Sequence, residues 1–209
     1  LDLVITAFNT VFISLISSFI IVSLAFFMNF TKNYFNNNAI KKVSQLVILG
    51  YAMPGAIIAI GVLKLNSSIN DLFSLIIIGS ISGLIFSYVV RFLAIAWQPI
   101  ESSIEKFGVN TNQASRVLNV KPIKSMVRIN FPFLKKPLLI ASLIVFIDIS
   151  KELPLTLILR PFNFDTLATL TYDLISQAHF FQSSVPSLLI IFISLPAILV
   201  INKQAGKKV

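Results

Sequence analysis

Five long apolar runs dominate this chain and restrict the folds open to it more than any other feature. They cover residues 3–28, 46–63, 72–97, 137–159 and 185–201. Each has roughly the 20 residues that an α-helix needs to cross a bilayer core about 30 Å thick. Continuous Leu, Ile, Phe and Val, without alternation of polar and apolar residues, favour helices over transmembrane strands. We therefore expect an all-α, polytopic transmembrane helical bundle with about five spanning helices.

The composition agrees with a membrane protein. Of the 209 residues, 56% are hydrophobic and 12% are charged, and the mean hydropathy of +0.89 excludes an ordinary water-soluble domain. The sequence has no cysteine, so disulfides, thiolate zinc sites and iron–sulfur clusters are excluded. We expect the single histidine, His179, to be a solvated loop residue rather than a metal ligand. We expect residues 1–209 to form one transmembrane domain and, since Leu1 opens the chain, to be part of a longer one.

The positive charges predict how the helices are oriented. Of the 17 Lys and Arg residues, all but Lys64, Lys151 and Arg160 fall on one side of the predicted helices, with Arg91 counted in the loop that follows the third helix. Because Lys and Arg concentrate in cytoplasmic loops, the N-terminus is expected outside and the C-terminus in the cytoplasm. The loop over about residues 98–136 is then cytoplasmic, and the net charge of +9 needs no nucleic-acid partner.

A polar, basic island lies within that loop. Residues 113–132 read Q-A-S-x-x-x-N-x9-I-x-F-P. Asn at 110 and 112 suits a helix start, Asn119 suits a left-handed helix end, and Pro122 suits the first position of a second helix, which Pro132 is expected to end. We therefore predict a stiff helix–turn–helix. Ala114, Val117 and Leu118 are expected to share one face of the first helix, and one face of the second helix is expected to consist of Ile123, Met126, Val127 and Asn130.

The spacing of this island resembles the E-A-A-x-x-x-G-x9-I-x-L-P signature of the membrane subunits of bacterial ABC importers. Gln113, Ser115, Asn119 and Phe131 stand where that signature has Glu, Ala, Gly and Leu. Three further stretches resemble ferric-iron importer permeases: G-Y-A-M-P-G-A at 50–56, Y-V-V-R-F at 88–92 and K-E-L-P-L-T-L-I-L-R-P-F-N-F-D-T-L-A-T at 151–169. The resemblance covers essentially the whole chain, and it implies the second half of a permease with two homologous halves.

This resemblance implies a type I ABC importer permease that moves a substrate, ferric iron by family, across the bacterial inner membrane by alternating access. The implied partners are a cytoplasmic ABC ATPase dimer, a periplasmic substrate-binding protein, a second permease half or subunit, and the lipid bilayer. The implied ATPase-coupling residues are Gln113, Ala114, Ser115, Asn119, Ile129 and Pro132. The chain itself is expected to bind no cofactor and to be no enzyme, because 50–57 lacks the Lys and Ser or Thr of a phosphate loop. ATP and magnesium belong to the ATPase.

Charged residues near the membrane allow two interpretations. Asp148, Lys151 and Glu152 have i, i+3 and i+4 spacing, so they are expected to share a helix face and pair with each other. With Arg160, and with Pro54 bending or unwinding the second helix, they form a candidate translocation path or gate. The other interpretation is a structural ion-pair cluster. No metal site is assigned.

Other functions remain open at this stage. The island is also compatible with an amphipathic hairpin on the inner leaflet. Thiamine and other small-solute ABC permeases share the expected fold, so the substrate is open. An ion-coupled secondary transporter or channel would use Asp148 and Glu152 as its ion site, and an intramembrane enzyme lacks a convincing nucleophile and base. The segment 161–182 is either a docking surface for a binding protein or a plain surface loop.

Overall fold

The computed structural model describes residues 2–35, 42, 46–47, 49–73, 79–107 and 109–205. Within these residues every regular element is a helix, so the predicted all-α class is confirmed. The elements are α1 (Asp2–Phe35), α3 (Gly55–Phe73), α4 (Ile81–Phe107), α5 (Val109–Val117), α6 (Pro122–Ser125), a π-helix (Met126–Asn130), α7 (Phe131–Ser150), α8 (Pro154–Leu159), α9 (Leu167–Ser176) and α10 (Phe180–Ala205).

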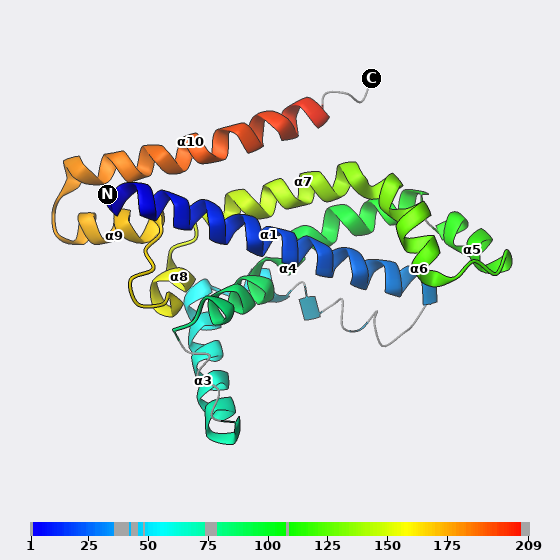
Figure 1. The fold of residues 1–209 in the computed structure, drawn as a ribbon, viewed down its shortest axis with the longest axis horizontal. Helices are drawn as coiled ribbons and strands as arrows, with labels where there is room; N and C mark the ends of the chain where they lie inside the picture. The colour runs from blue at the N-terminus through cyan, green and yellow to red at the C-terminus, as the bar shows by residue number, and fades with distance from the viewer. Residues whose placement is uncertain are drawn as a thin grey trace.

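Three long helices, α1, α4 and α7, form the centre of the molecule and pack lengthwise against one another (Figure 1). Their shared core is built from large apolar side chains on α4, such as Tyr88, Trp97 and Ile100, with Val145 of α7 and Ile21 of α1, all buried. Small polar residues let the helices approach closely. Ser14 of α1 and Ser150 of α7 are both buried and share a hydrogen bond of 3.3 Å.

The remaining helices lie around this centre. α10 runs beside α7 and contacts α9, while α3 packs on α8 and α4 and projects away from the bundle (Figure 1). α5 and α6 lie at one end of the long axis, and α9 lies at the other end, near the N-terminus (Figure 1). The molecule therefore has a hairpin end and an α9 end, joined by α1, α4 and α7.

Three of the described helices are long and apolar enough to cross a membrane, over Leu3–Phe35, Ile81–Lys106 and Phe180–Gln204. α7 is apolar over most of its length, but it carries Lys135, Lys136 and Asp148. Large apolar side chains on α1 and α10 face outward, among them Val4, Phe8, Phe19 and Phe192. Such exposure suits contact with lipid rather than with water. A total of five spans stays a prediction.

Two of the expected helices are broken. The run 137–159 is interrupted at residues 151–153, so that α7 ends at Ser150 and α8 begins at Pro154. The run 46–63 is interrupted at Met53 and Pro54, which confirms that Pro54 breaks the second helix. Proline explains both breaks, because it lacks a backbone N–H and disfavours helical geometry in the residue before it.

The third expected helix begins later than predicted. The run 72–97 was expected to be one helix, but α4 begins at Ile81 and Leu72 belongs to α3. Gly79 has a φ of +70° and lies in a turn before α4, and no atom of the described residues lies within 4 Å of where its Cβ would be. Gly79 therefore lies outside α4, and the sequence prediction missed this turn because apolar composition alone does not reveal one.

Candidate functional site

The predicted helix–turn–helix exists as a hairpin of α5 and α6, here called the α5–α6 hairpin. Asn119 has a φ of 54°, so it adopts the left-handed conformation that ends α5. Pro122 occupies the first turn of α6. The local turn chemistry was therefore predicted correctly.

Pro132 does not end the second helix, contrary to the sequence prediction. α6 passes through the π-helix into α7 with right-handed helical backbone at both joins, at Met126 and Phe131. Pro132 then lies in the first turn of α7. A proline ring clashes with the carbonyl four residues earlier in an α-helix, and the wider i→i+5 spacing of a π-turn directly before it relieves that clash. The hairpin is therefore continuous with α7.

A buried polar network holds the two arms of the hairpin together. Asn130 Nδ2 donates to Asn112 Oδ1 at 2.9 Å and to the Ser125 carbonyl at 3.2 Å. Ser115 and Ser125 share a hydrogen bond between their hydroxyls at 3.1 Å, and Ser115 Oγ also donates to the Asn112 carbonyl at 2.9 Å. All four residues are buried. The buried Asn112 Nδ2 has no hydrogen-bond partner among the described residues, but the other bonds join the two arms. Buried hydrogen-bond networks rigidify a packing, so we describe the hairpin as a stiff unit.

The hairpin is also attached to the end of α1. The Tyr34 hydroxyl donates to the Val120 carbonyl at 3.0 Å, and Arg116 donates to the Tyr34 carbonyl at 3.2 Å. The guanidinium of Arg116 lies 6.0 Å from the centre of the Tyr34 ring. The hairpin therefore contacts α1 as well as continuing into α7.

Four large apolar side chains of the hairpin and of the π-helix that follows it remain exposed. They are Val117, Leu118, Ile123 and Val127, with exposed fractions between 54% for Val127 and 86% for Val117. We call these four residues the hairpin patch. Among the predicted coupling residues, Gln113, Ala114, Asn119 and Pro132 are exposed, Ile129 is half-buried, and Ser115 is buried inside the polar network. Ser115 therefore supports the hairpin from within.

A second polar group lies where the broken second helix meets α4 and α8. Arg91 Nε lies 3.5 Å from Glu152 Oε2, and both side chains are mostly buried. Glu152 Oε1 also accepts from the Leu155 backbone N–H at 3.2 Å. A Cβ on Gly55 would lie 2.2 Å from Arg91 Nη1 and 2.8 Å from Glu152 Oε1. Gly55 thus gives the ion pair its space.

This arrangement corrects two sequence predictions. Arg91 was counted in a loop after the third helix, but it lies inside α4, where pairing with Glu152 accommodates its charge. Asp148, Lys151 and Glu152 were expected to pair with each other on one helix face. Only Asp148 and Lys151 do so, at 2.8 Å. The helix ends at Ser150, so Glu152 turns toward Arg91 instead.

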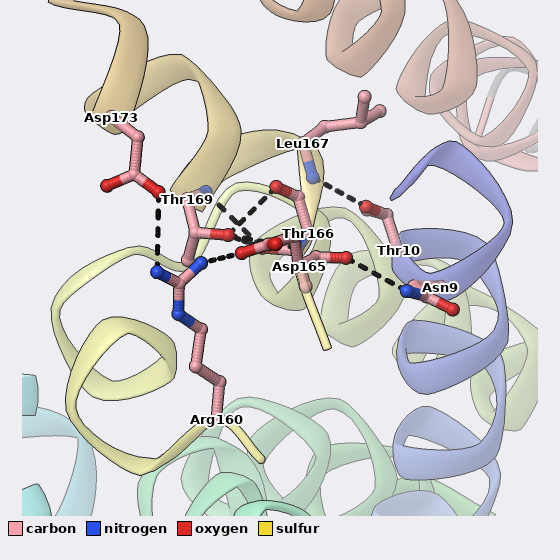
Figure 2. Close-up of polar contacts among 8 residues, drawn as sticks. All are labelled: Asn9, Thr10, Arg160, Asp165, Thr166, Leu167, Thr169 and Asp173. Atoms are coloured by element: carbon pink, nitrogen blue, oxygen red, sulfur yellow. Dashed lines mark hydrogen bonds and ion pairs between the residues drawn. The ribbon is translucent and has the colours of Figure 1, made fainter. Parts of the chain in front are cut away.

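Arg160 belongs to a separate cluster at the α9 end of the molecule (Figure 2). It pairs with Asp165 and, at 3.3 Å, with Asp173 of α9. Figure 2 also shows Thr166 and Thr169 forming a reciprocal cap at the start of α9. Asn9 donates to the Asp165 carbonyl at 3.1 Å, and the Leu167 N–H donates to Thr10 Oγ1 at 2.8 Å. The segment after α8 is thereby fastened to α1, while His179 is exposed in the turn before α10.

A cleft of about 540 Å³ lies between the second-helix break, α4 and α7. Its polar lining residues are Tyr51, Gln98 and Asp148, and its apolar lining residues are Ala94, Ile95, Pro99 and Ile144. Asp148 was a predicted path residue. Tyr51 and Gln98 were missed, and the available signal was the position of Tyr51 within the G-Y-A-M-P-G-A stretch. Pro54 lies at the break but does not line this cleft.

Comparison with known proteins first defines the class. The chain has the fold of an ABC importer permease: it matches a chain in the crystal structure of a bacterial ABC transporter involved in the import of the acidic polysaccharide alginate, with a TM-score of 0.71 and 16% identity, over 98% of this chain and 78% of that one. No family model matches.

The sequence comparison is more particular. Over 166 residues the chain is 22% identical to the Fe(3+)-transport system permease protein FbpB 2 of Haemophilus influenzae (strain ATCC 51907 / DSM 11121 / KW20 / Rd). The match covers 79% of this chain and 32% of that protein, so the chain spans about a third of the relative's length. The predicted resemblance to a ferric-type ABC importer permease is thereby confirmed. Together with the apolar helices, these relatives support a multi-pass inner-membrane protein.

Proposed function

We propose that this chain is the transmembrane permease subunit of a binding-protein-dependent ABC importer that carries ferric iron into the cytoplasm. The observation that carries the proposal is the α5–α6 hairpin, a stiff polar-cored unit with an exposed apolar patch at one end of a helical bundle. The fold match and the similarity to a ferric-iron permease support it.

The hairpin has the properties that a force-transmitting contact needs. The hairpin patch would insert into a groove of a cytoplasmic ATPase dimer, and burial of its four apolar side chains would hold the two proteins together. Since Gln113 replaces the Glu of the signature, this docking depends on apolar contact rather than on a salt bridge from that position. The ATPase supplies ATP and magnesium, and this chain performs no bond chemistry.

Orientation and remaining partners follow from the same proposal. The α5–α6 hairpin lies in the cytoplasm, the N-terminus of the chain is periplasmic and the C-terminus is cytoplasmic, in agreement with the excess of Lys and Arg on the hairpin side. A periplasmic binding protein delivers the substrate at the α9 end. A second permease half or subunit completes the path, since alternating access needs two packed arrangements of helices around one route. ATP-driven closure of the ATPase pair then moves the hairpin and changes that packing.

Iron is the cargo because the similarity to a named Fe(3+) permease extends over most of the chain. Thiamine or another small solute is the alternative cargo within the same importer class. Copurifying the periplasmic binding protein and identifying its bound solute separates these cargoes.

The coupling role is tested with Ala114→Arg in the complete importer. Ala114 is exposed on α5, so the larger cationic side chain should leave the fold intact while obstructing the ATPase groove. We expect the ATPase to be lost on copurification and ATP-driven uptake to fall at least about tenfold, equivalent to about 1.4 kcal/mol. Gln177→Arg, an exposed site at the α9 end, serves as the control and should retain the ATPase. Unchanged copurification and uptake in Ala114→Arg would refute the coupling role.

A further inference from the structure

The cleft between the second-helix break, α4 and α7 collects oxygen donors from three separate parts of the chain. Tyr51 lies just before the break at Pro54, Gln98 lies on α4 and Asp148 lies on α7. The other lining residues are apolar. A few polar groups in a mostly apolar cleft are the usual composition of a small-ligand site.

The donor types restrict the ligand. A phenol, a carboxamide and a carboxylate offer hard oxygen ligands, which suit small, highly charged cations, whereas soft metals prefer sulfur. Tyrosine oxygen is an established ligand of ferric iron in proteins. Among the described residues there is no group of three or more His, Cys, Asp or Glu side chains that would hold a metal tightly. A sparse donor set suits transport, because a site on a path must also release its ion.

Asp148 is the carboxylate free to change partners. Its present partner is Lys151, at 2.8 Å, but the Lys151 side chain is 60% exposed and lies in the non-helical segment after α7. An ion pair with such an exposed partner contributes little to stability, so Lys151 is easily displaced. Glu152 differs, since it is only 7% exposed and is held by Arg91 and by the Leu155 N–H.

The cleft also has a suitable depth for a translocation path. Ala94, Ile95 and Gln98 lie near the middle of α4, which is one of the membrane-length helices. Transporter sites commonly lie near the bilayer midplane beside interrupted helices, and here the interruption is at Met53 and Pro54. The backbone there lies close to α4, since a Cβ on Gly50 would be 2.1 Å from the Val90 carbonyl oxygen. The Tyr51 backbone is thereby held close to α4, while the Tyr51 side chain is 52% exposed.

We propose that this cleft is a transient ferric-ion site on the translocation path, with the Tyr51 phenolate and the Asp148 carboxylate as ligands and the Gln98 carbonyl as a third contact. When the ion binds, the Tyr51 phenol releases its proton to water and Asp148 exchanges Lys151 for the metal. The remaining coordination positions stay with water or with the second permease half. The inference rests on the proposed function for its cargo.

The test uses the intact importer, with its ATPase and binding protein, reconstituted in liposomes. Fe3+ supplied as its nitrilotriacetate complex is the spectroscopic probe, and Fe3+ loaded on the binding protein is the transport substrate. Wild type should show a phenolate-to-iron charge-transfer band that Tyr51→Phe lacks. Tyr51→Phe and Asp148→Asn should each reduce Fe3+ uptake about tenfold or more. The control, Glu105→Gln, changes an exposed carboxylate outside the cleft and should behave as wild type.

A third variant should raise the affinity for Fe3+ instead of lowering it. Lys151→Ala frees Asp148 and should raise the affinity of the cleft for Fe3+, which a merely structural role of the ion pair would not do. This inference alone would be overturned if wild type takes up Fe3+ but shows no charge-transfer band, and Tyr51→Phe and Asp148→Asn take up Fe3+ at wild-type rates. A wild-type importer that takes up another solute but not Fe3+ would overturn the cargo and this inference together.

Discussion

Gly55→Ala should destabilise the protein through an ion pair that the glycine itself does not form. The added methyl group would lie 2.2 Å from Arg91 Nη1 and 2.8 Å from Glu152 Oε1, far inside van der Waals contact. The guanidinium is the end of a flexible side chain and can move, but movement lengthens the 3.5 Å contact between Arg91 Nε and Glu152 Oε2. The loss of stability should therefore come from weakening of the buried ion pair rather than from strain in the backbone.

The magnitude follows from two destabilising effects and one smaller stabilising effect. Overpacking a filled site costs about 1–3 kcal/mol, and complete separation of a buried pair costs about 3–5 kcal/mol. Ala in place of Gly returns less than about 1 kcal/mol through helix propensity, and less at the first residue of α3 than in its interior. We expect a net loss of roughly 2 kcal/mol, because the pair is strained but not eliminated.

The assay is thermal unfolding of the purified importer in detergent. Gly61→Ala is the matched control: Gly61 also lies in α3, and in the part of the chain that the structure describes nothing lies within 4 Å of where its Cβ would be. Gly61→Ala should be neutral or stabilising. In a background that carries Arg91→Met and Glu152→Gln, Gly55→Ala should reduce the free energy of unfolding by less. That background lacks the ion pair that the added methyl group disturbs, so the comparison measures the coupling between them. If Gly55→Ala is as stable as Gly61→Ala, the argument from the ion pair is refuted.

Two further predictions concern the hairpin and the α9 end. Asn130→Ala removes the donor to Asn112 Oδ1 and to the Ser125 carbonyl, so we expect the free energy of unfolding to fall by about 1–3 kcal/mol. The ATPase should still copurify, but more ATP should be hydrolysed per solute imported. An unchanged ratio of ATP to solute would contradict this. Arg160→Met removes two pairs with half-buried aspartates and should cost less than about 1 kcal/mol in thermal unfolding. A loss several times larger would show that the cluster does more than fasten the segment.

Local chemistry made part of the hairpin predictable. Asn119 and Pro122 act through their own backbone preferences, which need no distant partner. Pro132 was mispredicted because the π-turn before it depends on tertiary contacts: Asn130 bonds to Asn112 on the other arm of the hairpin. A single-sequence pattern contains no sign of that contact.

The charged and polar residues of the bundle were less predictable for the same reason. Arg91 and Glu152 meet only because α4 packs beside the α7–α8 break. Tyr51, Gln98 and Asp148 line one cleft only once three elements are assembled. Composition predicted that long helices exist, because a continuous apolar run can form a membrane-length helix whichever residues it contacts. It did not predict where α4 begins or where the second and fourth runs break.

The hairpin and the cleft share the same helices, which connects the proposed coupling to the proposed ferric-ion site. α7 continues from the hairpin through the π-helix and carries Asp148, while α4 leads toward α5 and carries Gln98. A shift of the hairpin would therefore move the two walls of the cleft relative to each other. Because packed helices exchange between discrete arrangements rather than deforming continuously, such a shift would separate or unite the oxygen donors. Movement of the hairpin patch would thus act on the affinity for the ion as well as on access to it.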